Sequence, residues 1–290
     1  PRVGRSPPDE RDVAQLSQDT TGEFDVVILG GGSGGYACAL RASQLGLSVA
    51  LIEEGKLGGT CLHNGCIPTK ALLHAAEVAD ETREGSKVGV LSQLTGIDMV
   101  QVNNYKDSVV ARLYKGLQGL VSQRGVTYVE GTGRLVAPNA VEVNGTRYVG
   151  RNIVLATGSY ARSLPGLEIP GRVVTSDQAM VMDWIPPSVI VLGGGVIGVE
   201  FASVWRSFGS DVTIVEALPR LVPAEDEACS KALERAFRKR GIRFSTGVRF
   251  SGVTQDANGV TVTLEDGTSL TADLLLVAVG RGPRSEGNGF

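Results

Sequence analysis

One pattern occurs twice in this chain, and it restricts the possible folds more than any other feature. Residues 24–35 read FDVVILGGGSGG, and residues 188–198 read SVIVLGGGVIG. In both copies a short apolar run ends in the glycine spacing G-x-G-x-x-G, and a helical pattern follows. The spacing is formed by Gly30, Gly32 and Gly35 and, in the second copy, by Gly193, Gly195 and Gly198. Strand, glycine turn and helix in this order are typical of a mononucleotide-binding unit of the Rossmann type.

An acid follows each glycine turn at the same distance. Glu53 lies 23 residues after Gly30, and Glu216 lies 23 residues after Gly193, each near the end of a second apolar run. The first glycine permits a tight turn, the second lets a pyrophosphate approach the backbone, and the third lets the helix pack on the strand. An acid about 20 residues further on accepts hydrogen bonds from ribose hydroxyls. One such turn is a weak signal, but two with equal spacing predict two dinucleotide-binding units.

Both halves of the chain also continue in the same way. Residues 126–149 and residues 248–271 alternate between apolar and polar positions and contain Asn-Gly, Asp-Gly or Pro-Asn turn signals. Each segment predicts a β-meander of short strands. We therefore expect an α/β fold with two tandem Rossmann-like domains, each carrying a β-meander. The expected parts are a flexible tail at 1–22, a first domain at 23–160, a second domain at 161–284, and a return into the first domain at 285–290.

Charge and composition exclude several classes of function. Lys+Arg 28 against Asp+Glu 31 gives a net charge of −3, so no basic field favours nucleic acid or anionic lipid. No apolar run of about 18 residues is present, which argues against a membrane span. The polar first 22 residues contain no apolar core of the kind that a signal peptide needs. We expect a cytoplasmic protein with no nucleic-acid or membrane partner.

The first half contains an additional segment with two cysteines, EGKLGGTCLHNGCIPTKALLHAAEVAD. Cys61 and Cys66 are separated by four residues in a glycine-flanked loop that enters a helical pattern. A helix N-terminus stabilises a thiolate, and Lys70 adds positive charge one turn later. Such a pair could cycle between dithiol and disulfide, whereas a buried free pair or a zinc site is the alternative interpretation. Cys38 and Cys229 are interpreted as structural.

These residues together resemble a known family. The sequence GGTCLHNGCIPTK, placed between GGGSGG and GGGVIGVEF, resembles the flavin-dependent pyridine nucleotide-disulfide oxidoreductases, and the resemblance covers residues 24–290. Within that family, CIPTKALLHAAE looks most like the dihydrolipoamide-oxidising members. The resemblance implies an enzyme that oxidises protein-bound dihydrolipoamide to lipoamide with NAD⁺ as acceptor, through a Cys61–Cys66 redox disulfide and FAD.

The resemblance also implies a role for individual residues. Cys61 would be the interchange thiol that attacks substrate, Cys66 would be the charge-transfer thiol against the flavin, and Lys70 would lie near the flavin, paired with Glu200. The first domain would hold FAD through Gly30, Gly32, Ser33, Gly35, Glu53, Gly59, Thr60, Lys70, Gly133 and Ser159. The second domain would hold the nicotinamide cofactor through Gly193, Gly195, Val196, Ile197, Gly198, Glu216, Val248 and Gly280. No metal is expected.

Glu216 predicts which nicotinamide cofactor is used. A carboxylate there bonds the adenosine ribose hydroxyls and repels a 2′-phosphate, which favours NAD over NADP. Arg220, four residues later in a proline-flanked turn, is a mild signal in the opposite direction. The implied partner is dihydrolipoamide on an acyl-carrier component of a 2-oxo acid dehydrogenase complex, and the implied oligomer is a homodimer.

The sequence departs from the family pattern at its C-terminal end. Family members continue into a second flavin-contacting segment and an interface domain, which supplies a His-Glu pair across the dimer. Neither His63 nor His74 occupies that place, so we expect a C-terminally truncated chain that is poorly active alone. The alternatives are another NAD(P)H-dependent disulfide reductase or a mercuric reductase, and a nucleotide-binding module without turnover.

Overall fold

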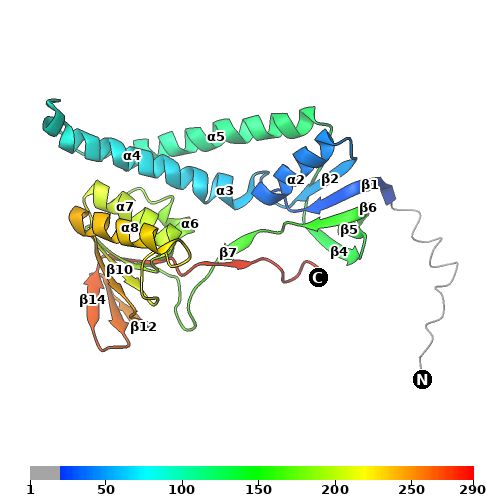
Figure 1. The fold of residues 1–290 in the computed structure, drawn as a ribbon. Coiled ribbons are helices and arrows are strands. Elements are labelled where there is room, and N and C mark those ends of the chain that lie inside the picture. The colour runs from blue at the N-terminus through cyan, green and yellow to red at the C-terminus, as the bar shows by residue number, and fades with distance from the viewer. Residues whose placement is uncertain (1–19) are drawn as a thin grey trace, which may run out of the picture. The chain divides into compact units, whose positions relative to one another are not determined.

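The computed structural model describes residues 20–290, which form two compact units that are described separately (Figure 1). Of the described residues, unit 1 comprises 20–61 together with 113–158 and 283–290, and unit 2 comprises 62–112 and 159–282. Of the predicted tail at 1–22, residues 1–19 lie outside the described residues, and residues 20–22 open the first strand. The compact units assign 62–112 to unit 2, although the sequence analysis places this segment in the first domain.

Unit 1 is built on a six-stranded sheet in the order β3-β2-β1-β6-β5-β4. The parallel strands are β1 (Thr20–Leu29), β2 (Val49–Glu53), β3 (Thr127–Glu130) and β6 (Thr146–Leu155), and the antiparallel ones are β4 (Gly133–Ala137) and β5 (Ala140–Val143). The prediction of a meander over 126–149 needs one correction, because β3 extends the parallel sheet at its edge. The meander consists of β4, β5 and the first half of β6.

The central strand β2 and the second half of β1 are buried on both faces, as their continuous apolar runs predict. On β1, Val26 and Ile28 face one core cluster, and Val27 and Leu29 face the other. The first cluster is covered by α2 (Ser33–Gln44) and by the second half of α5 (Met99–Gln123). The second cluster is closed by the meander strands. The glycine turn after β1 is therefore held between two packed layers.

Unit 2 repeats this plan with a five-stranded parallel sheet in the order β11-β10-β9-β15-β8. Its strands are β8 (Val173–Thr175), β9 (Ser188–Leu192), β10 (Asp211–Glu216), β11 (Arg243–Thr246) and β15 (Leu274–Val277). The helices α7 (Val196–Phe208) and α8 (Glu227–Arg240) cover one face (Figure 1). The meander of β12 (Phe250–Gln255), β13 (Val260–Leu264) and β14 (Ser269–Ala272) covers the other face. The predicted class, two Rossmann-like units each with a β-meander, is confirmed.

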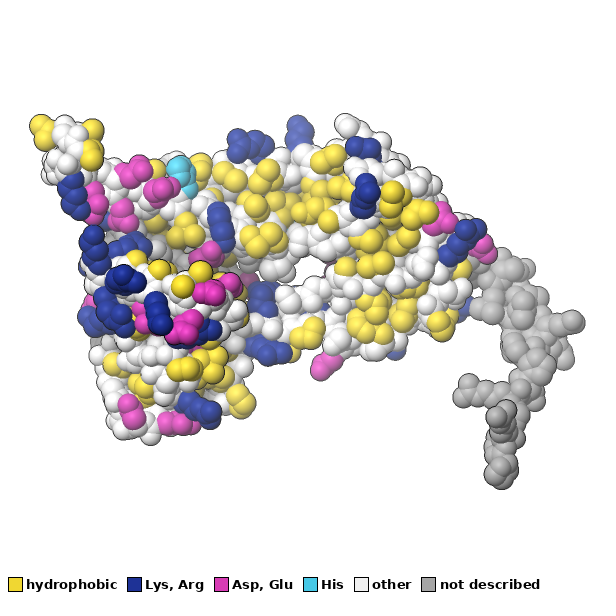
Figure 2. Space-filling view, viewed as in Figure 1, with side chains coloured by type: hydrophobic (Ala, Val, Ile, Leu, Met, Phe, Trp, Pro, Cys, Tyr) yellow, Lys and Arg dark blue, Asp and Glu magenta, His cyan; other side chains and the backbone are white. Residues whose placement is uncertain are grey.

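The surface of α8 carries charges of both signs. Figure 2 shows basic and acidic side chains interspersed over this helix rather than separated by sign. Lys231 pairs with Glu227 at 2.7 Å and Arg238 pairs with Glu234 at 3.4 Å, both at i,i+4 spacing. This is the arrangement expected of a solvated helix face.

The additional segment of the first half forms four helices and a connecting stretch. They are α3 (Gly59–His63), α4 (Cys66–Glu84), the short 3₁₀ helix η1 (Gly85–Val88) and α5. Leu72 and Ala76 of α4 belong to the same buried cluster as Phe201 and Trp205 of α7. This packing is the physical reason that α4 falls in unit 2. The short helix α6 (Ser176–Ala179) precedes β9 in the same unit.

A buried lysine fixes the first half of α5 within unit 2. Lys106 is only 3% exposed, and its Nζ donates a hydrogen bond of 2.8 Å to the carbonyl of Met180 at the end of α6. Lys106→Ala leaves that carbonyl without its donor and creates a cavity, so we expect a loss of about 2–4 kcal/mol of unfolding free energy. Urea denaturation measures it, with the exposed Lys115→Ala on the same helix as control. Equal midpoints for the two variants would contradict the assignment.

Candidate active site and cofactor sites

The first glycine of each turn adopts a backbone conformation that other residues avoid. Gly30 has φ +107° and Gly193 has φ +111°. A Cβ at Gly30 would lie 2.1 Å from the carbonyl oxygen of Ala156, and a Cβ at Gly193 would lie 2.4 Å from that of Ala278. Both turns therefore require glycine for conformation and for space.

The third glycine of each turn lets a helix approach its strand. A Cβ at Gly35 would lie 1.8 Å from the carbonyl oxygen of Gly30, and a Cβ at Gly198 would lie 1.9 Å from that of Gly193. No side chain fits at these separations. This is the packing role that the spacing predicts.

The second glycine of each turn stands at an open helix N-terminus. Gly32 caps α2 and Gly195 caps α7, both with extended backbone and without a side-chain cap. A Cβ on Gly195 would meet no atom within 4 Å, so the space in front of α7 is open. The first N–H groups of a helix have no intrahelical partner and favour an anion. Both turns therefore fit a pyrophosphate.

Glu216 is fixed by the backbone beside the second turn. Its Oε2 accepts a hydrogen bond of 2.6 Å from the N–H of Gly194, and its Oε1 accepts one of 2.7 Å from the N–H of Leu218. The side chain is buried, with 8% exposed. An ionised carboxylate has about four acceptor sites, so two remain for ribose hydroxyls. The backbone thus orients an acceptor for a nucleotide before any nucleotide is bound.

Glu53 repeats this arrangement in unit 1. Its Oε2 accepts from the N–H of Gly31 at 2.6 Å, and its Oε1 accepts from that of Gly55 at 2.8 Å. On the adjacent strand, partial burial first and the carboxylates of Glu130 and Glu53 next raise the pKa of Tyr128 to about 12. The phenol of Tyr128 therefore stays protonated beside this acidic strand end.

A cavity of about 560 Å³ lies at the carboxyl ends of the strands of unit 2. Ligands of open α/β sheets bind at this end. The predicted residues that line it are Gly193, Gly195, Val196, Ile197, Glu216, Val248 and Gly280. Gly198, the remaining predicted residue, packs beneath the turn instead. The cavity is therefore the candidate nicotinamide-nucleotide site.

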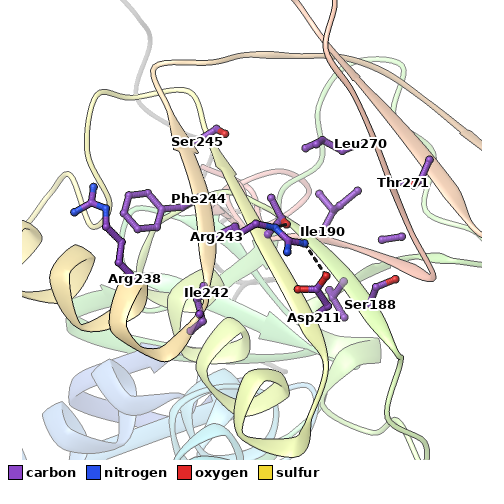
Figure 3. Close-up of a pocket in the computed structure, with 14 residues that line it drawn as sticks. Ser188, Ile190, Asp211, Arg238, Ile242, Arg243, Phe244, Ser245, Leu270 and Thr271 are labelled. Carbon is purple, nitrogen blue, oxygen red and sulfur yellow. Dashed lines mark hydrogen bonds and ion pairs between the residues drawn. The ribbon is translucent and has the colours of Figure 1, made fainter.

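A second cavity of unit 2, of about 590 Å³, lies at the opposite end of the strands (Figure 3). Figure 3 shows Arg243 and Asp211 pointing toward each other across it, and their ion pair measures 2.7 Å. Arg243 also donates to the hydroxyl of Thr213 at 3.1 Å. Because its charges are paired internally and it lies at the amino ends of the strands, this cavity is not assigned to a nucleotide.

The two predicted redox cysteines lie in successive helices of the chain. Cys61 is partly buried in α3, and Cys66 is exposed as the first residue of α4. The first turn of α4 carries no acid, and its N-cap, Gly65, supplies no side-chain cap. The start of the helix therefore carries no negative side chain next to Cys66, and the positive end of the helix dipole favours a thiolate there.

The predicted pairing of Lys70 with Glu200 is present. Lys70 Nζ lies 2.6 Å from Glu200 Oε1, which joins α4 to α7 within unit 2. The lysine side chain is 58% exposed and the glutamate 28%. The pair aligns the helix that starts with Cys66 on the helix that starts at the nucleotide turn. The catalytic role of both residues stays a prediction.

Two glycines predicted for the FAD site are required by the structure of unit 1. Gly59 has φ +56°, and a Cβ there would lie 2.6 Å from the Cα of Gly32. Gly133 is buried, and a Cβ there would lie 2.6 Å from the Cδ1 of Leu29 and 2.9 Å from Ile52 Cγ2. Packing explains Gly133, and its approach to a flavin stays a prediction.

The other residues predicted to bind FAD are either solvent-accessible or already hydrogen-bonded within the protein. Ser33 is exposed at the start of α2, and Thr60 is partly buried in α3. Ser159 lies on β7 (Ser159–Ala161), where its hydroxyl and carbonyl accept hydrogen bonds of 2.8 and 2.9 Å from Arg281. Arg281 begins β16 (Arg281–Pro283), which pairs with β7. The sequence analysis did not anticipate Arg281.

The loop between β10 and α8 was also missed as part of the nucleotide site. Leu218, Val222, Pro223 and Glu225 line the cavity together with Glu216. The sequence signals only a proline-flanked turn here, and such a turn does not reveal which of its side chains face a ligand.

The fold and the sites define a nucleotide-dependent redox protein. The defining features are two glycine turns that fit pyrophosphates, two oriented carboxylates and a cysteine at the start of a helix. The family model described as pyridine nucleotide-disulphide oxidoreductase matches residues 24–289. The chain belongs to this family of flavoprotein oxidoreductases.

Individual relatives agree with this assignment. The chain is 42% identical over 287 residues to dihydrolipoyl dehydrogenase of Bacillus subtilis, covering 92% of this chain and 60% of the relative. LpdA from Mycobacterium tuberculosis matches with a TM-score of 0.83 at 27% identity, covering 93% of this chain and 61% of that one. The HOCl-induced flavoprotein disulfide reductase RclA from Escherichia coli matches with a TM-score of 0.76 at 29% identity, covering 90% and 57%. The chain thus spans about three fifths of the length of these relatives.

The residues of the chain fit FAD and NAD(H), the cofactors of its dihydrolipoyl dehydrogenase relatives. Gly30, Gly32 and Glu53 form the cradle in unit 1, and Gly193, Gly195 and Glu216 form the equivalent cradle in unit 2.

Two negative findings apply to residues 20–290. No helix in this range combines the length and apolar character that crossing a membrane requires. In the same range, no three His, Cys, Asp or Glu side chains are grouped so as to hold a metal ion.

Proposed function

We propose that this chain carries the nucleotide-binding and cysteine-bearing part of a dihydrolipoamide dehydrogenase, which oxidises protein-bound dihydrolipoamide to lipoamide with NAD⁺ as acceptor. The observation that carries the proposal is Cys66 at the open start of α4, on a helix bound to α7 through Lys70 and Glu200. The similarity to dihydrolipoyl dehydrogenase of Bacillus subtilis supports the substrate.

The thiol chemistry is a disulfide exchange. A substrate thiolate attacks Sγ of Cys61 in the Cys61–Cys66 disulfide, so that bond breaks and Cys66 leaves as a thiolate. The second thiol of the substrate then attacks the substrate sulfur that is bonded to Cys61. This breaks the mixed disulfide and releases the Cys61 thiolate. The substrate becomes a cyclic disulfide and loses two electrons, which the cysteine pair gains. When bound, FAD supplies the two-electron relay between this dithiol and NAD⁺.

Residues of the chain position the reacting thiol and the nucleotide. The start of α4 stabilises the leaving Cys66 thiolate, and Glu200 holds the ammonium group of Lys70 in place. Glu216, held by two backbone N–H groups, accepts the adenosine ribose hydroxyls and repels a 2′-phosphate. These effects position reactants and charges in advance, which is the protein's contribution in a cofactor enzyme.

The further parts of the proposal rest on the same relatives. The FAD-binding domain is proposed at 23–160 and the NAD-binding domain at 161–284. The proposed partner is the lipoyl-bearing component of a 2-oxo acid dehydrogenase complex, and the proposed setting is a cytoplasmic homodimer.

A visible absorption spectrum tests the function. The chain is loaded with FAD, and one equivalent of dihydrolipoamide or of reduced glutathione is added under anaerobic conditions. Dihydrolipoamide should produce a long-wavelength thiolate-to-flavin band, and glutathione should not. A different result is that NADPH reduces the bound flavin, another disulfide reoxidises it, and dihydrolipoamide has no effect. The chain would then be a disulfide reductase, the class to which RclA belongs by name.

Substitution of Glu216 tests the nucleotide preference. Glu216→Gln removes the charge but keeps one acceptor, so the NADH dissociation constant should rise about tenfold or more. The constant for NADPH should rise less, because the repulsion of its 2′-phosphate is also lost. Fluorescence titration measures both, with the exposed Glu265→Gln of unit 2 as control. Equal losses for the two nucleotides would contradict the role.

A further inference from the structure

The loop that joins β10 to α8 forms one wall of the nucleotide cavity in unit 2. It runs from Ala217 to Asp226, and Val222, Pro223 and Ala224 line the cavity beside the glycine turn. The loop contains no regular secondary structure, so other contacts must fix its path.

Arg220 closes this loop on itself. Its Nη2 donates hydrogen bonds of 2.9 Å to the carbonyl of Pro223 and 3.0 Å to the carbonyl of Glu225. Its Nη1 is buried and has no hydrogen-bond partner within residues 20–290. Arg220 does not line the cavity. The guanidinium therefore stabilises the loop that forms the cavity wall and does not contact the cavity itself.

The shape that Arg220 holds is strained. Val222 has φ +42°, a left-handed conformation that β-branched residues avoid. Its N–H donates a hydrogen bond of 2.7 Å to the carbonyl of Gly194 in the nucleotide turn. Leu221 is fully buried, and its Cδ2 would lie 2.6 Å from a Cβ at Gly194. The loop thus packs closely against Gly194, and the N–H of Gly194 is the donor that orients Glu216.

We propose that Arg220 is a positioning residue that sets nucleotide affinity and leaves discrimination to Glu216. By bonding Pro223 and Glu225, it keeps Val222 against the glycine turn and the cavity wall in place. Its side chain is not part of the cavity lining, so its charge is not placed to bind a 2′-phosphate there. The inference rests on the proposed binding of NAD(H) in this cavity. It replaces the interpretation of Arg220 as a sign of NADP binding with a role in holding the loop.

Binding measurements separate a positioning role from a phosphate-binding role. Dissociation constants for NADH and NADPH are measured by fluorescence titration for the unmodified chain, Arg220→Ala and Arg220→Lys. Arg220→Ala should weaken NADH and NADPH by the same factor, about tenfold. Arg220→Lys, which keeps a charged donor group but not the planar fork, should recover part of the loss. Arg249→Ala controls for the loss of a positive charge, because Arg249 is exposed beside Val248 and makes no side-chain bond to the loop.

A readout without nucleotide tests the same role. Amide hydrogen exchange of residues 217–226 should become faster in Arg220→Ala, while exchange in β13 stays unchanged. Selective loss of NADPH binding, or unchanged NADH affinity together with unchanged loop exchange, would overturn the inference while the proposed cofactor stands. An unmodified chain that binds no NADH would instead overturn the proposed cofactor, and this role with it.

Discussion

Cys66→Ser should lower the rate of disulfide exchange with dihydrolipoamide by a factor on the order of 10³ or more, because one half of the redox pair is gone. Serine keeps the size of the side chain but has neither the stabilised anion nor the ability to form a disulfide. Cys66 is exposed at the start of α4 and takes no part in a core cluster, so the fold should be retained.

Cys229→Ser is the matched control for this experiment. Cys229 is also exposed and also lies in the first turn of a helix, but that turn carries the acid Glu227, whereas the first turn of α4 carries no acid. The activity of this variant should equal that of the unmodified chain. Mass spectrometry of the oxidised protein adds a readout independent of turnover, since only Cys61 or Cys66 substitution should abolish the intramolecular disulfide. Exchange above a tenth of the original rate in Cys66→Ser would contradict the assignment.

Gly198→Ala should destabilise unit 2 by about 3–5 kcal/mol, a large part of the stability of an ordinary domain. The added Cβ would lie 1.9 Å from the carbonyl oxygen of Gly193, which is rigid backbone. To accommodate it, α7 must move away from β9, and the buried contacts of Phe201 and Ala202 are loosened. Thermal unfolding followed by circular dichroism measures the loss.

Gly195→Ala separates folding from binding. Gly195 has φ −74°, and a Cβ there meets no atom within 4 Å, so the melting temperature should be unchanged. The methyl group would nevertheless occupy the space in front of α7, where a pyrophosphate approaches the helix. NADH affinity should therefore fall without a loss of stability. A stable Gly198→Ala protein, or an unstable Gly195→Ala protein, would mean that the roles of the second and third glycines are misassigned.

The local parts of the nucleotide sites could be predicted from the sequence because each depends on neighbours in the chain. The positive φ of Gly30 and Gly193, the close contacts of Gly35 and Gly198, and the orientation of Glu53 and Glu216 all arise within one strand-turn-helix-strand unit. Glycine spacing and residue type are sufficient to specify such a unit.

Predictions that depended on strand partners were less complete. The alternation of residues 126–149 was interpreted as a meander throughout, but β3 pairs in parallel with β2 at the edge of the sheet. Alternation reports that one face of a strand is buried, and it does not report which strand lies beside it. The Lys70–Glu200 pair was anticipated only through the family resemblance, since 130 residues separate the two positions.

Two tandem nucleotide-binding units, their glycine turns, their acids and the cysteine pair could be predicted without a structure. Each of these features depends on residue types at short spacings along the chain. The packing of α4 on α7, the burial of Lys106 against the end of α6 and the bonds of Arg220 to its own loop became visible only in the folded chain. These contacts depend on where distant segments meet and which carbonyls remain unpaired there. That information exists only once the sheets have formed and the helices have packed on them.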